Sequence, residues 1–362
     1  MSECELYDVT IIGGGPAGLF SAFYSGLREM KTKIIEFQPF LGGKVNVYPE
    51  KMIWDVGGLK PIPGEQLIEQ MVAQGLTFSP TVILGEKVTS IVKGDEGHFV
   101  LQSDSGQTHY SRTVILAIGY GILKPTKLEL EGAERYEVAN LHYTVKSLGR
   151  FKDKTVLISG GGSTAIDWAN ELAPIAKQVY LTYRKEALKG HEAEVSKLLD
   201  NGVNCLLNTE IEKLIAQPDQ DTIGSVLLRN NEDSGMVELT VEEVIISHGY
   251  DQDRDLLDNS DVQIEMKNEW NVAGTPMSET SVPGIFAAGD LLSHDGKLHL
   301  IAGAFQDAAN AVNKAKQFIM PGAEAYAMVS SHNEAFIERN RELKKQLFAS
   351  NNNEEKRTPL HG

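Results

Sequence analysis

Short apolar runs that end on glycine alternate with longer amphipathic stretches along most of this chain. The first run, residues 7–12, is β-branched and apolar, which favours a buried strand of a parallel sheet. Residues 19–30 then predict a helix with small residues on its packing side, and residues 32–36 predict a second strand. A second unit of this kind follows about 150 residues later. The pattern therefore predicts an α/β protein.

A glycine turn joins the first predicted strand to the first predicted helix. Gly13, Gly15 and Gly18 stand at G-x-G-x-x-G spacing. In such a turn the first glycine allows the tight bend, the second lets the backbone approach a pyrophosphate, and the third permits close packing of helix on strand. Glu36 ends the second strand, where a carboxylate can accept hydrogen bonds from ribose hydroxyls. A mere turn is the alternative, but strand, helix and Glu36 in register favour a dinucleotide site.

The second unit carries a related turn. Residues 154–159 predict a strand that leads into Gly160, Gly162 and Ala165, a G-x-G-x-x-A turn, and a helix over 164–175 follows. Two glycine turns of this kind imply two dinucleotides. The residues at the start of the helix are further candidates for this site, namely Ser163 and Thr164.

Cations replace the acid in the second unit. The position equivalent to Glu36 falls near Arg184 and Lys185, and Lys189 follows. An acid would pair with the ribose 2′-hydroxyl of NAD, whereas a guanidinium can bind a 2′-phosphate in bidentate fashion. These cations therefore predict NADPH. The alternative is that they solvate a surface loop.

Length, charge and cysteine content narrow the class of protein. A chain of 362 residues is long enough for two domains, and a formal net charge of −16 argues against nucleic acid as a partner. Cys4 and Cys205 lie far apart and form no C-x-x-C, so neither a disulfide framework nor a metal site is expected. The N-terminus lacks a basic leader and no apolar run reaches membrane-spanning length. We therefore expect a cytoplasmic protein with no membrane contact.

Residues 284–290 (Gly-Ile-Phe-Ala-Ala-Gly-Asp), taken with the two dinucleotide units, resemble the pyridine nucleotide-disulfide reductase superfamily, and the compact form resembles bacterial thioredoxin reductase. The C-x-x-C dithiol of thioredoxin reductase is absent, because the corresponding stretch is 140–145 (Asn-Leu-His-Tyr-Thr-Val). In lacking the dithiol, and in its motifs at 41–44, 48–51 and 297–303, the chain is similar to the thioredoxin-reductase-like ferredoxin–NADP⁺ reductases. The resemblance covers nearly the whole chain.

The resemblance implies a domain plan. Two Rossmann-like three-layer (ββα) domains are expected, with an NADPH domain inserted into an FAD domain through crossover strands at 113–119 and 244–249. The expected boundaries are 1–119 and 249–328 for the two parts of the FAD domain, 120–248 for the NADPH domain, and 329–362 for a C-terminal extension that begins as a helix and ends as a flexible tail.

The resemblance also implies residues that contact FAD. The matching positions are Gly15, Pro16, Ala17, Glu36, Lys44, Tyr48, Val88, Leu123, Asp290 and Ser331, with Gly289 preceding the aspartate. Asp290 follows a predicted strand, at the end where ligands bind in open α/β sheets, although it would also suit a helix cap. Tyr48 is expected to stack on the isoalloxazine, and ordinary core packing is its alternative. Either Val329 or His332 covers the second flavin face, and the sequence leaves this choice open.

The implied activity is hydride transfer from NADPH to flavin N5, followed by single-electron transfer to ferredoxin or flavodoxin. The cofactor carries the chemistry, so no protein nucleophile or base is required. Two alternatives stay open: an NADPH diaphorase or oxidase that uses quinone, free flavin or another acceptor, and a redox-sensing module without turnover. The resemblance also implies that the protein is a homodimer, because the family is homodimeric. An acidic ferredoxin would require a local basic patch, from residues such as Lys44, Lys51 or Lys297.

Overall fold

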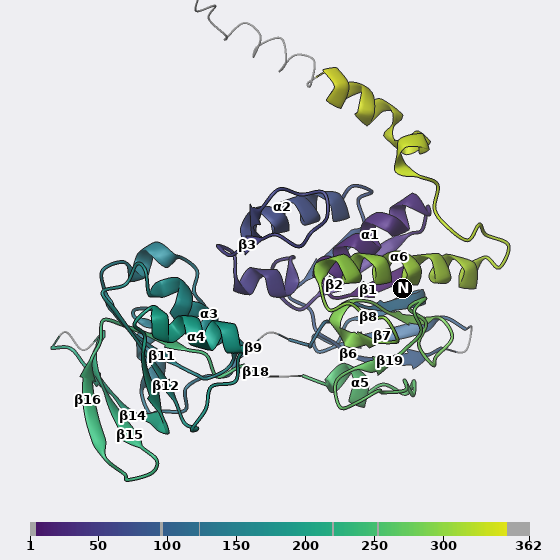
Figure 1. Ribbon diagram of the computed structural model, residues 1–362. Helices are drawn as coiled ribbons and strands as arrows, with labels where there is room; N and C mark the ends of the chain where they lie inside the picture. The colour runs from purple at the N-terminus through teal and green to yellow at the C-terminus, as the bar shows by residue number, and fades with distance from the viewer. Residues whose placement is uncertain (1–4, 95–96, 123, 219–220, 252, 346–362) are drawn as a thin grey trace, which may run out of the picture. The chain divides into compact units, whose positions relative to one another are not determined.

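The computed structural model describes residues 5–345 except 95–96, 123, 219–220 and 252 (Figure 1). Contacts between Cα atoms divide the chain into two compact units. We call the described residues of Met1–Phe40, Ala73–Ala117 and Asn259–Gly362 the first unit, and those of Leu41–Val72 and Ile118–Asp258 the second unit. The boundaries expected from the sequence, 1–119, 120–248 and 249–328, stay a prediction.

A sheet with a parallel centre forms the first unit. Its strand order is β5-β2-β1-β8-β7-β6, and β20 pairs with β8 outside that path. The central strand β1 is apolar and buried, as expected of a strand covered on both faces, and it pairs in parallel with β2 and β8. The parallel strands are β1 (Leu6–Ile12), β2 (Thr32–Glu36), β5 (Thr81–Leu84), β8 (Thr108–Leu116) and β20 (Ile285–Ala287).

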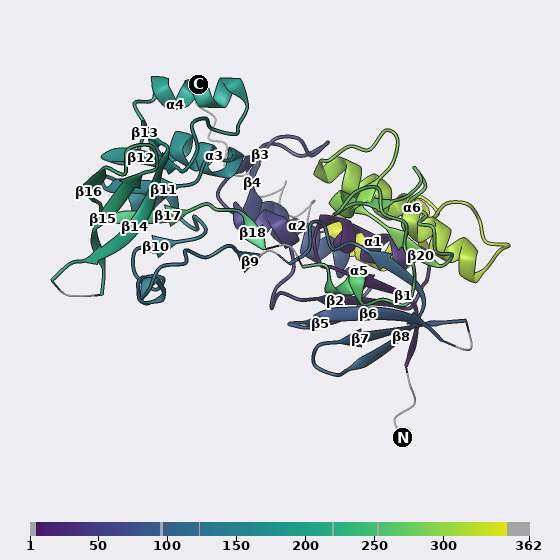
Figure 2. The same ribbon diagram turned by 90° about the horizontal axis from the view of Figure 1, so that it is seen from below.

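An antiparallel meander extends this sheet, as Figure 2 shows. It consists of β6 (Val88–Lys93), β7 (Phe99–Ser103) and the first half of β8. The second half of β8 pairs with β20 instead, so one long strand belongs to both parts of the sheet.

Two helices pack side by side against the parallel part of the first unit's sheet: α1 (Pro16–Leu27) and α6 (Ile301–Ile319) (Figure 1). The buried residues of α6 include Ala304, Ala308, Ala311 and Ala315, whose spacing of three and four residues places them on one face. Small side chains on that face permit a close approach to neighbouring elements. Aromatic contacts add to the packing, since the rings of Phe20 and Phe305 lie 4.9 Å apart.

The second unit has three layers, as predicted for a ββα domain. Its central sheet is parallel, in the order β10-β17-β11-β12-β13, and an antiparallel sheet in the order β14-β15-β16 forms another layer. The central strands are β10 (Leu141–His142), β11 (Thr155–Ser159), β12 (Gln178–Tyr183), β13 (Asn204–Leu207) and β17 (Glu243–Ile246). The outer strands are β14 (Thr209–Ala216), β15 (Ile223–Asn230) and β16 (Met236–Thr240).

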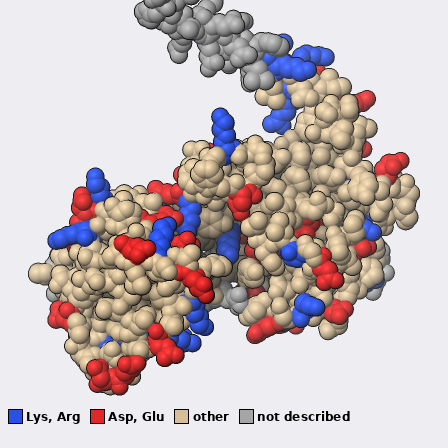
Figure 3. Space-filling model, viewed as in Figure 1, with Lys and Arg blue, Asp and Glu red and all other residues tan. Residues whose placement is uncertain are grey.

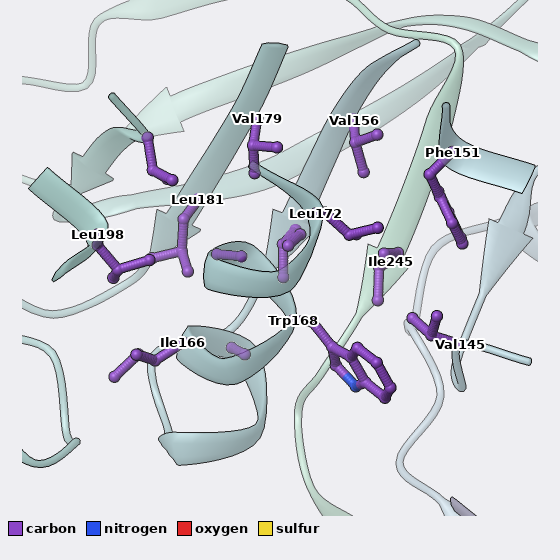
Figure 4. Packing of buried hydrophobic residues seen from close by; sticks show 14 residues of the cluster. Val145, Phe151, Val156, Ile166, Trp168, Leu172, Val179, Leu181, Leu198 and Ile245 are labelled. Atoms are coloured by element: carbon purple, nitrogen blue, oxygen red, sulfur yellow. The ribbon is translucent and has the colours of Figure 1, made fainter. Parts of the chain in front are cut away.

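Helices α3 (Ser163–Leu172) and α4 (Glu192–Asp200) form the third layer. Figure 4 shows Trp168 and Leu172 of α3 among Val156, Val179 and Ile245 of the central strands. A second buried cluster joins the central sheet to the outer strands. The core of the second unit therefore lies on both faces of the parallel sheet, and the predicted α/β class is confirmed.

Short elements complete the two units. They are η1 (Gly43–Val47), β3 (Met52–Ile53), β4 (Ile62–Pro63), α2 (Gly64–Gly75), β9 (Lys124–Pro125), η2 (Ala133–Tyr136), η3 (Leu148–Phe151), β18 (Tyr250–Asp251), α5 (Asp255–Asp258), β19 (Val272–Ala273), η4 (Gly289–Leu291), β21 (Leu292–Ser293), η5 (Ser330–His332) and η6 (Glu334–Phe336). Residues 337–345 are helical, and the predicted tail lies outside the described residues. Among the helices described, none combines the length and the apolar character needed to cross a membrane.

Candidate functional site

The first glycine turn has the backbone that a pyrophosphate site requires. Gly13 adopts φ +107°, and a Cβ added to Gly18 would lie 1.9 Å from the carbonyl oxygen of Gly13. These two positions therefore need glycine, the one for its conformation and the other for close helix packing. Gly15 is the N-cap of α1, with extended backbone, and it has no side chain that could accept from the first amides of the helix. Pro16 occupies the first turn. The N-terminus of α1 consequently keeps its positive end for an anion.

Glu36 is tied to this turn. Its side chain is buried, with 9% of the residue exposed; Oε2 accepts from the amide of Gly14 at 2.6 Å and Oε1 from that of Gln38 at 2.8 Å. Burial raises the pKa of Glu36, and the amide hydrogen bonds oppose that shift. A carboxylate has about four lone-pair directions, so the hydrogen bonds from Gly14 and Gln38 and the further interaction with the amide of Phe37 leave acceptor capacity for a ribose hydroxyl. The chain before Val88 also reaches this point, because the amide of Glu86 donates to the Glu36 carbonyl at 3.1 Å.

The Gly289–Asp290 turn lies at the same edge of the sheet. The amide of Ala288 donates to the carbonyl of Leu116 at 2.9 Å, and that of Ala117 donates to the carbonyl of Ile12 at 2.8 Å, so the ends of β1, β8 and β20 are aligned. A Cβ added to Gly289 would lie 3.0 Å from the Cβ of Ala17, which places this turn against the start of α1.

Asp290 itself is partly exposed, and its Oδ1 lies 3.8 Å from Nδ1 of His299. Its carboxylate thus remains accessible at the carboxyl end of a strand. The first unit therefore brings together three predicted features, namely the turn from Gly13 to Gly18, Glu36, and the pair Gly289–Asp290.

The other predicted FAD contacts lie elsewhere or are not described. Lys44, on η1, belongs to the second unit, with its Nζ 5.3 Å from the ring centroid of Tyr120. Tyr48 also belongs to the second unit, where it packs against the cluster that contains Trp168. Leu123 lies outside the described residues.

The last two predicted FAD contacts belong to the first unit. Val88 is buried at the start of β6. Ser331 is exposed on η5. The chain before η5 is held by Arg28, which donates a hydrogen bond of 2.6 Å to the carbonyl of Glu324. Val329 and His332, on either side of Ser331, are both exposed. Which of them covers the second flavin face therefore stays open.

The second glycine turn ends β11. Gly160 adopts φ +152°, and a Cβ there would lie 2.3 Å from the carbonyl oxygen of Ser247. At Gly162 an added Cβ would meet open space, so the backbone is accessible there. Ala165, in the first turn of α3, is fully buried. Ser163 and Thr164 are exposed at the start of α3. This is the arrangement of a pyrophosphate turn, with the helix N-terminus open.

The cationic loop lies beside this turn. The amide of Lys189 donates to the carbonyl of Gly161 at 2.6 Å, and the carbonyl of Lys185 accepts from Asn208 at 3.1 Å. Arg184, Lys185 and Lys189 are all exposed. The second unit therefore places three accessible cations next to a glycine turn, although the turn and the loop are about 25 residues apart in sequence.

His248 is a neighbour of this loop that sequence reasoning missed. Its Nε2 lies 2.8 Å from Oγ of Ser159, the last residue before the glycine turn. Burial lowers the pKa of His248, and the charge of Arg184 lowers it further. The signal in the sequence was its position near the end of the predicted crossover strand 244–249, one residue before Gly249.

Lys297, one of the three lysines considered for a basic patch, is buried and does not belong to such a patch. Only 5% of its side chain is exposed, and Nζ pairs with the buried carboxylate of Asp307 and donates to the carbonyl of Gly289 at 2.7 Å. Lys51 is also engaged, at 2.9 Å from Asp167. On the face seen in Figure 3, Lys and Arg side chains lie among Asp and Glu side chains on each unit. The sequence held a signal for the burial of Lys297. Asp307 lies among the alanines of the 301–319 helix, and a buried carboxylate requires a partner of opposite charge.

Comparison with known proteins identifies the family. The family model of pyridine nucleotide-disulphide oxidoreductases matches residues 7–315. A protein of Bacillus mycoides named ferredoxin–NADP reductase 1 is 64% identical over 348 residues, which are 96% of this chain and 100% of that protein. Its namesake in Bacillus cytotoxicus is 65% identical with the same coverage.

A solved structure shares the fold. The thioredoxin reductase of Lactococcus lactis superposes with a TM-score of 0.69 at 24% identity, covering 87% of this chain and 99% of that one. The predicted fold class, α/β with two Rossmann-like dinucleotide-binding domains, is thereby confirmed. Because the family match spans most of the sequence, the chain belongs to the pyridine nucleotide-disulphide oxidoreductase family.

Proposed function

We propose that this protein is an FAD-dependent ferredoxin–NADP⁺ reductase, which oxidises NADPH and reduces ferredoxin. The observation that carries the proposal is the presence of two glycine turns on separate parallel sheets, the first tied to Glu36 and the second bordered by Arg184. Proteins named ferredoxin–NADP reductase that are 62–65% identical over nearly the whole chain support the same activity. Bound FAD supplies the chemistry, because a flavin accepts two electrons as a hydride and releases them singly.

The first unit fits FAD. The open N-terminus of α1 suits the pyrophosphate, the remaining lone pairs of Glu36 suit the ribose hydroxyls, and the accessible carboxylate of Asp290 suits the ribityl chain. Beside these, we propose as FAD contacts the positions that match the family: Lys44, Tyr48, Val88, Leu123 and Ser331.

The second unit fits NADPH. The accessible backbone at Gly162, with Ser163 and Thr164 at the start of α3, suits the pyrophosphate. Arg184 suits the 2′-phosphate because its guanidinium can donate two parallel hydrogen bonds, and Lys185 and Lys189 add positive charge. Residues 120–248 are accordingly our proposed NADPH domain, inserted between the FAD-binding parts 1–119 and 249–328.

Reduction of a disulfide is not supported by the thiols of the chain. The stretch 140–145, where thioredoxin reductase carries its dithiol, contains β10 and no cysteine. Cys205 is a free thiol, and burial raises its pKa, so the nucleophilic thiolate is disfavoured. The residues of this chain bind and orient the two dinucleotides, and the electrons leave through a one-electron carrier.

Flavodoxin as an alternative acceptor, a homodimeric assembly and a cytoplasmic location are also part of the proposal. The first two rest on the resemblance to ferredoxin–NADP⁺ reductases, and the third on the low cysteine content. A diaphorase with another acceptor remains the second candidate.

An acceptor comparison tests this function. Purified protein is first treated with acid, and the released flavin is identified by chromatography; we expect FAD. NADPH consumption is then measured with ferredoxin, flavodoxin, thioredoxin, a quinone or oxygen as acceptor, and we expect the highest kcat/KM with ferredoxin or flavodoxin. A higher kcat/KM with quinone would favour the diaphorase, and recovery of FMN would contradict the assignment of the first unit.

A further inference from the structure

Side chains from three other segments hold the backbone of the turn that carries Asp290. The amide of Gly289 donates to Oδ2 of Asp307 at 3.0 Å. The carbonyl of Gly289 accepts from Nζ of Lys297 at 2.7 Å. The carbonyl of Asp290 accepts from Nδ2 of Asn271 at 2.9 Å. The peptide on each side of Gly289 is therefore fixed by a charged side chain.

The two charged groups are themselves buried. Lys297 and Asp307 form an ion pair in which each side chain is only 5% exposed, and His294 Nε2 lies 3.4 Å from the other carboxylate oxygen of Asp307. Removing two charges from water costs free energy, and this cost can exceed the attraction between them, so a buried ion pair need not stabilise the fold. A role beyond stability is consistent with the fact that both partners also bind Gly289.

Rigid elements hold this pair. Asp307 lies on the buried face of α6, between Ala304 and Ala308, and Lys297 lies in the segment just before that helix. Helix α6 packs against α1, which begins at the first glycine turn. Gly289 adopts φ +79°, and its Cα side faces Ala17 at the start of α1, where an added Cβ would lie 3.0 Å from the Cβ of Ala17. The pair thus fixes the turn to the same helical layer that carries the glycine turn.

We propose that Lys297 and Asp307 are positioning residues for FAD. They hold the two peptides around Gly289 so that the carboxylate of Asp290 is presented at the carboxyl edge of the sheet. They act through Asp290 and bind no ligand themselves. This inference rests on the proposed function, because it takes FAD as the ligand of Asp290.

A double-mutant cycle distinguishes positioning from simple support of α6. Coupled residues give non-additive effects, whereas independent ones add. We compare wild type, Lys297→Met, Asp290→Ala and the combination of both. The dissociation constant of FAD is measured by adding FAD to apoprotein and following flavin fluorescence, and thermal unfolding of each apoprotein is followed by circular dichroism.

Positioning predicts a specific pattern. Lys297→Met should weaken FAD binding by about tenfold or more in the wild-type background and by less than about twofold in the Asp290→Ala background. A matched control is Lys314→Met on α6, the helix that carries Asp307, because Lys314 makes a partly exposed ion pair of its own, 3.4 Å from Glu279. The control should leave FAD binding unchanged.

A second variant covers the case in which Lys297→Met does not fold. Lys297→Met combined with Asp307→Asn leaves no unpaired buried charge, and the amide oxygen introduced at 307 can still accept from Gly289. It replaces the single variant in the same cycle, and again a loss of FAD affinity that vanishes with Asp290→Ala is expected. Equal loss in both backgrounds, or no loss at all, overturns the positioning role. If wild-type protein binds no FAD, the proposed function fails first and the inference fails with it.

Discussion

The backbone amide of Gly14 donates a hydrogen bond of 2.6 Å to Oε2 of Glu36. This contact joins the first glycine turn to the end of the neighbouring strand, 22 residues later. It places a buried carboxylate beside the N-terminus of α1, where the helix dipole and the amides of the turn favour negative charge. The two parts of a dinucleotide site, one for pyrophosphate and one for ribose, are thereby held in one piece.

Replacing this carboxylate tests its role in FAD binding. Glu36→Gln puts an NH₂ donor where one of two oxygens now accepts from a backbone amide, and it removes a charge-assisted acceptor for ribose. We expect FAD affinity to fall at least about tenfold, because a hydrogen bond to a charged group contributes about 1.5–3 kcal/mol. Titration of apoprotein with FAD measures it. Glu65→Gln, at an exposed position, is the control and should bind FAD like wild type.

Arg184 should decide between the two nicotinamide nucleotides. A charge-assisted phosphate contact of about 1.5–3 kcal/mol corresponds to a preference for NADPH over NADH of at least about tenfold. Arg184→Glu should abolish that preference, mainly through a lower kcat/KM for NADPH. Lys197→Glu makes the same change in charge on the exposed surface of α4 and should keep the preference. Equal kcat/KM values for both nucleotides in wild type would count against the phosphate site.

Glu243 should stabilise the second unit in a pH-dependent manner. It is only 2% exposed, lies 2.6 Å from Nε2 of His142 and also pairs with Lys154 and Arg150. Burial would raise its pKa, but the hydrogen bonds from His142 and Lys154 outweigh that cost and lower the pKa below 4.5. Glu243→Gln should lower the free energy of unfolding by about 2 kcal/mol at pH 7, less than for a fully buried pair because Lys154 and Arg150 can reach water.

The sign of the pH effect follows from the lowered pKa. The stabilisation is present above the unfolded value of 4.5 and is lost as the pH falls through the folded value. The difference between wild type and Glu243→Gln should therefore be full near pH 7 and shrink below about pH 4.5. Urea unfolding at several pH values measures it. Glu242→Gln, at the exposed neighbouring position, should show a smaller difference.

Cys205 should be dispensable for electron transfer. It is a free thiol on β13, its pKa is raised by burial, and no second cysteine of the described chain accompanies it. Cys205→Ser should therefore retain NADPH-dependent reduction of ferredoxin within about twofold, and neither protein should reduce thioredoxin. A folded Cys205→Ser variant without ferredoxin reduction would show that the thiol takes part.

Local sequence determined much of the candidate site, because glycine turns express backbone requirements within a few residues. Gly13 and Gly160 adopt positive φ, and Gly18 packs where no side chain fits, as the glycine patterns predicted. The exposure of Arg184 and Lys185 was also predictable, because both residues come directly after a strand. The alternation of apolar strands and amphipathic helices predicted the α/β class for the same reason, since each period is a local property.

Tertiary structure alone decided how distant polar residues pair. Lys297 reads as a surface cation in the sequence, but α6 brings Asp307 beside it and buries both against Gly289. His248 likewise meets Ser159 only because β17 and β11 are neighbours in the sheet. A buried charge is stable only with a partner of opposite charge, and that partner is supplied by packing between elements far apart in the chain, which no local pattern encodes.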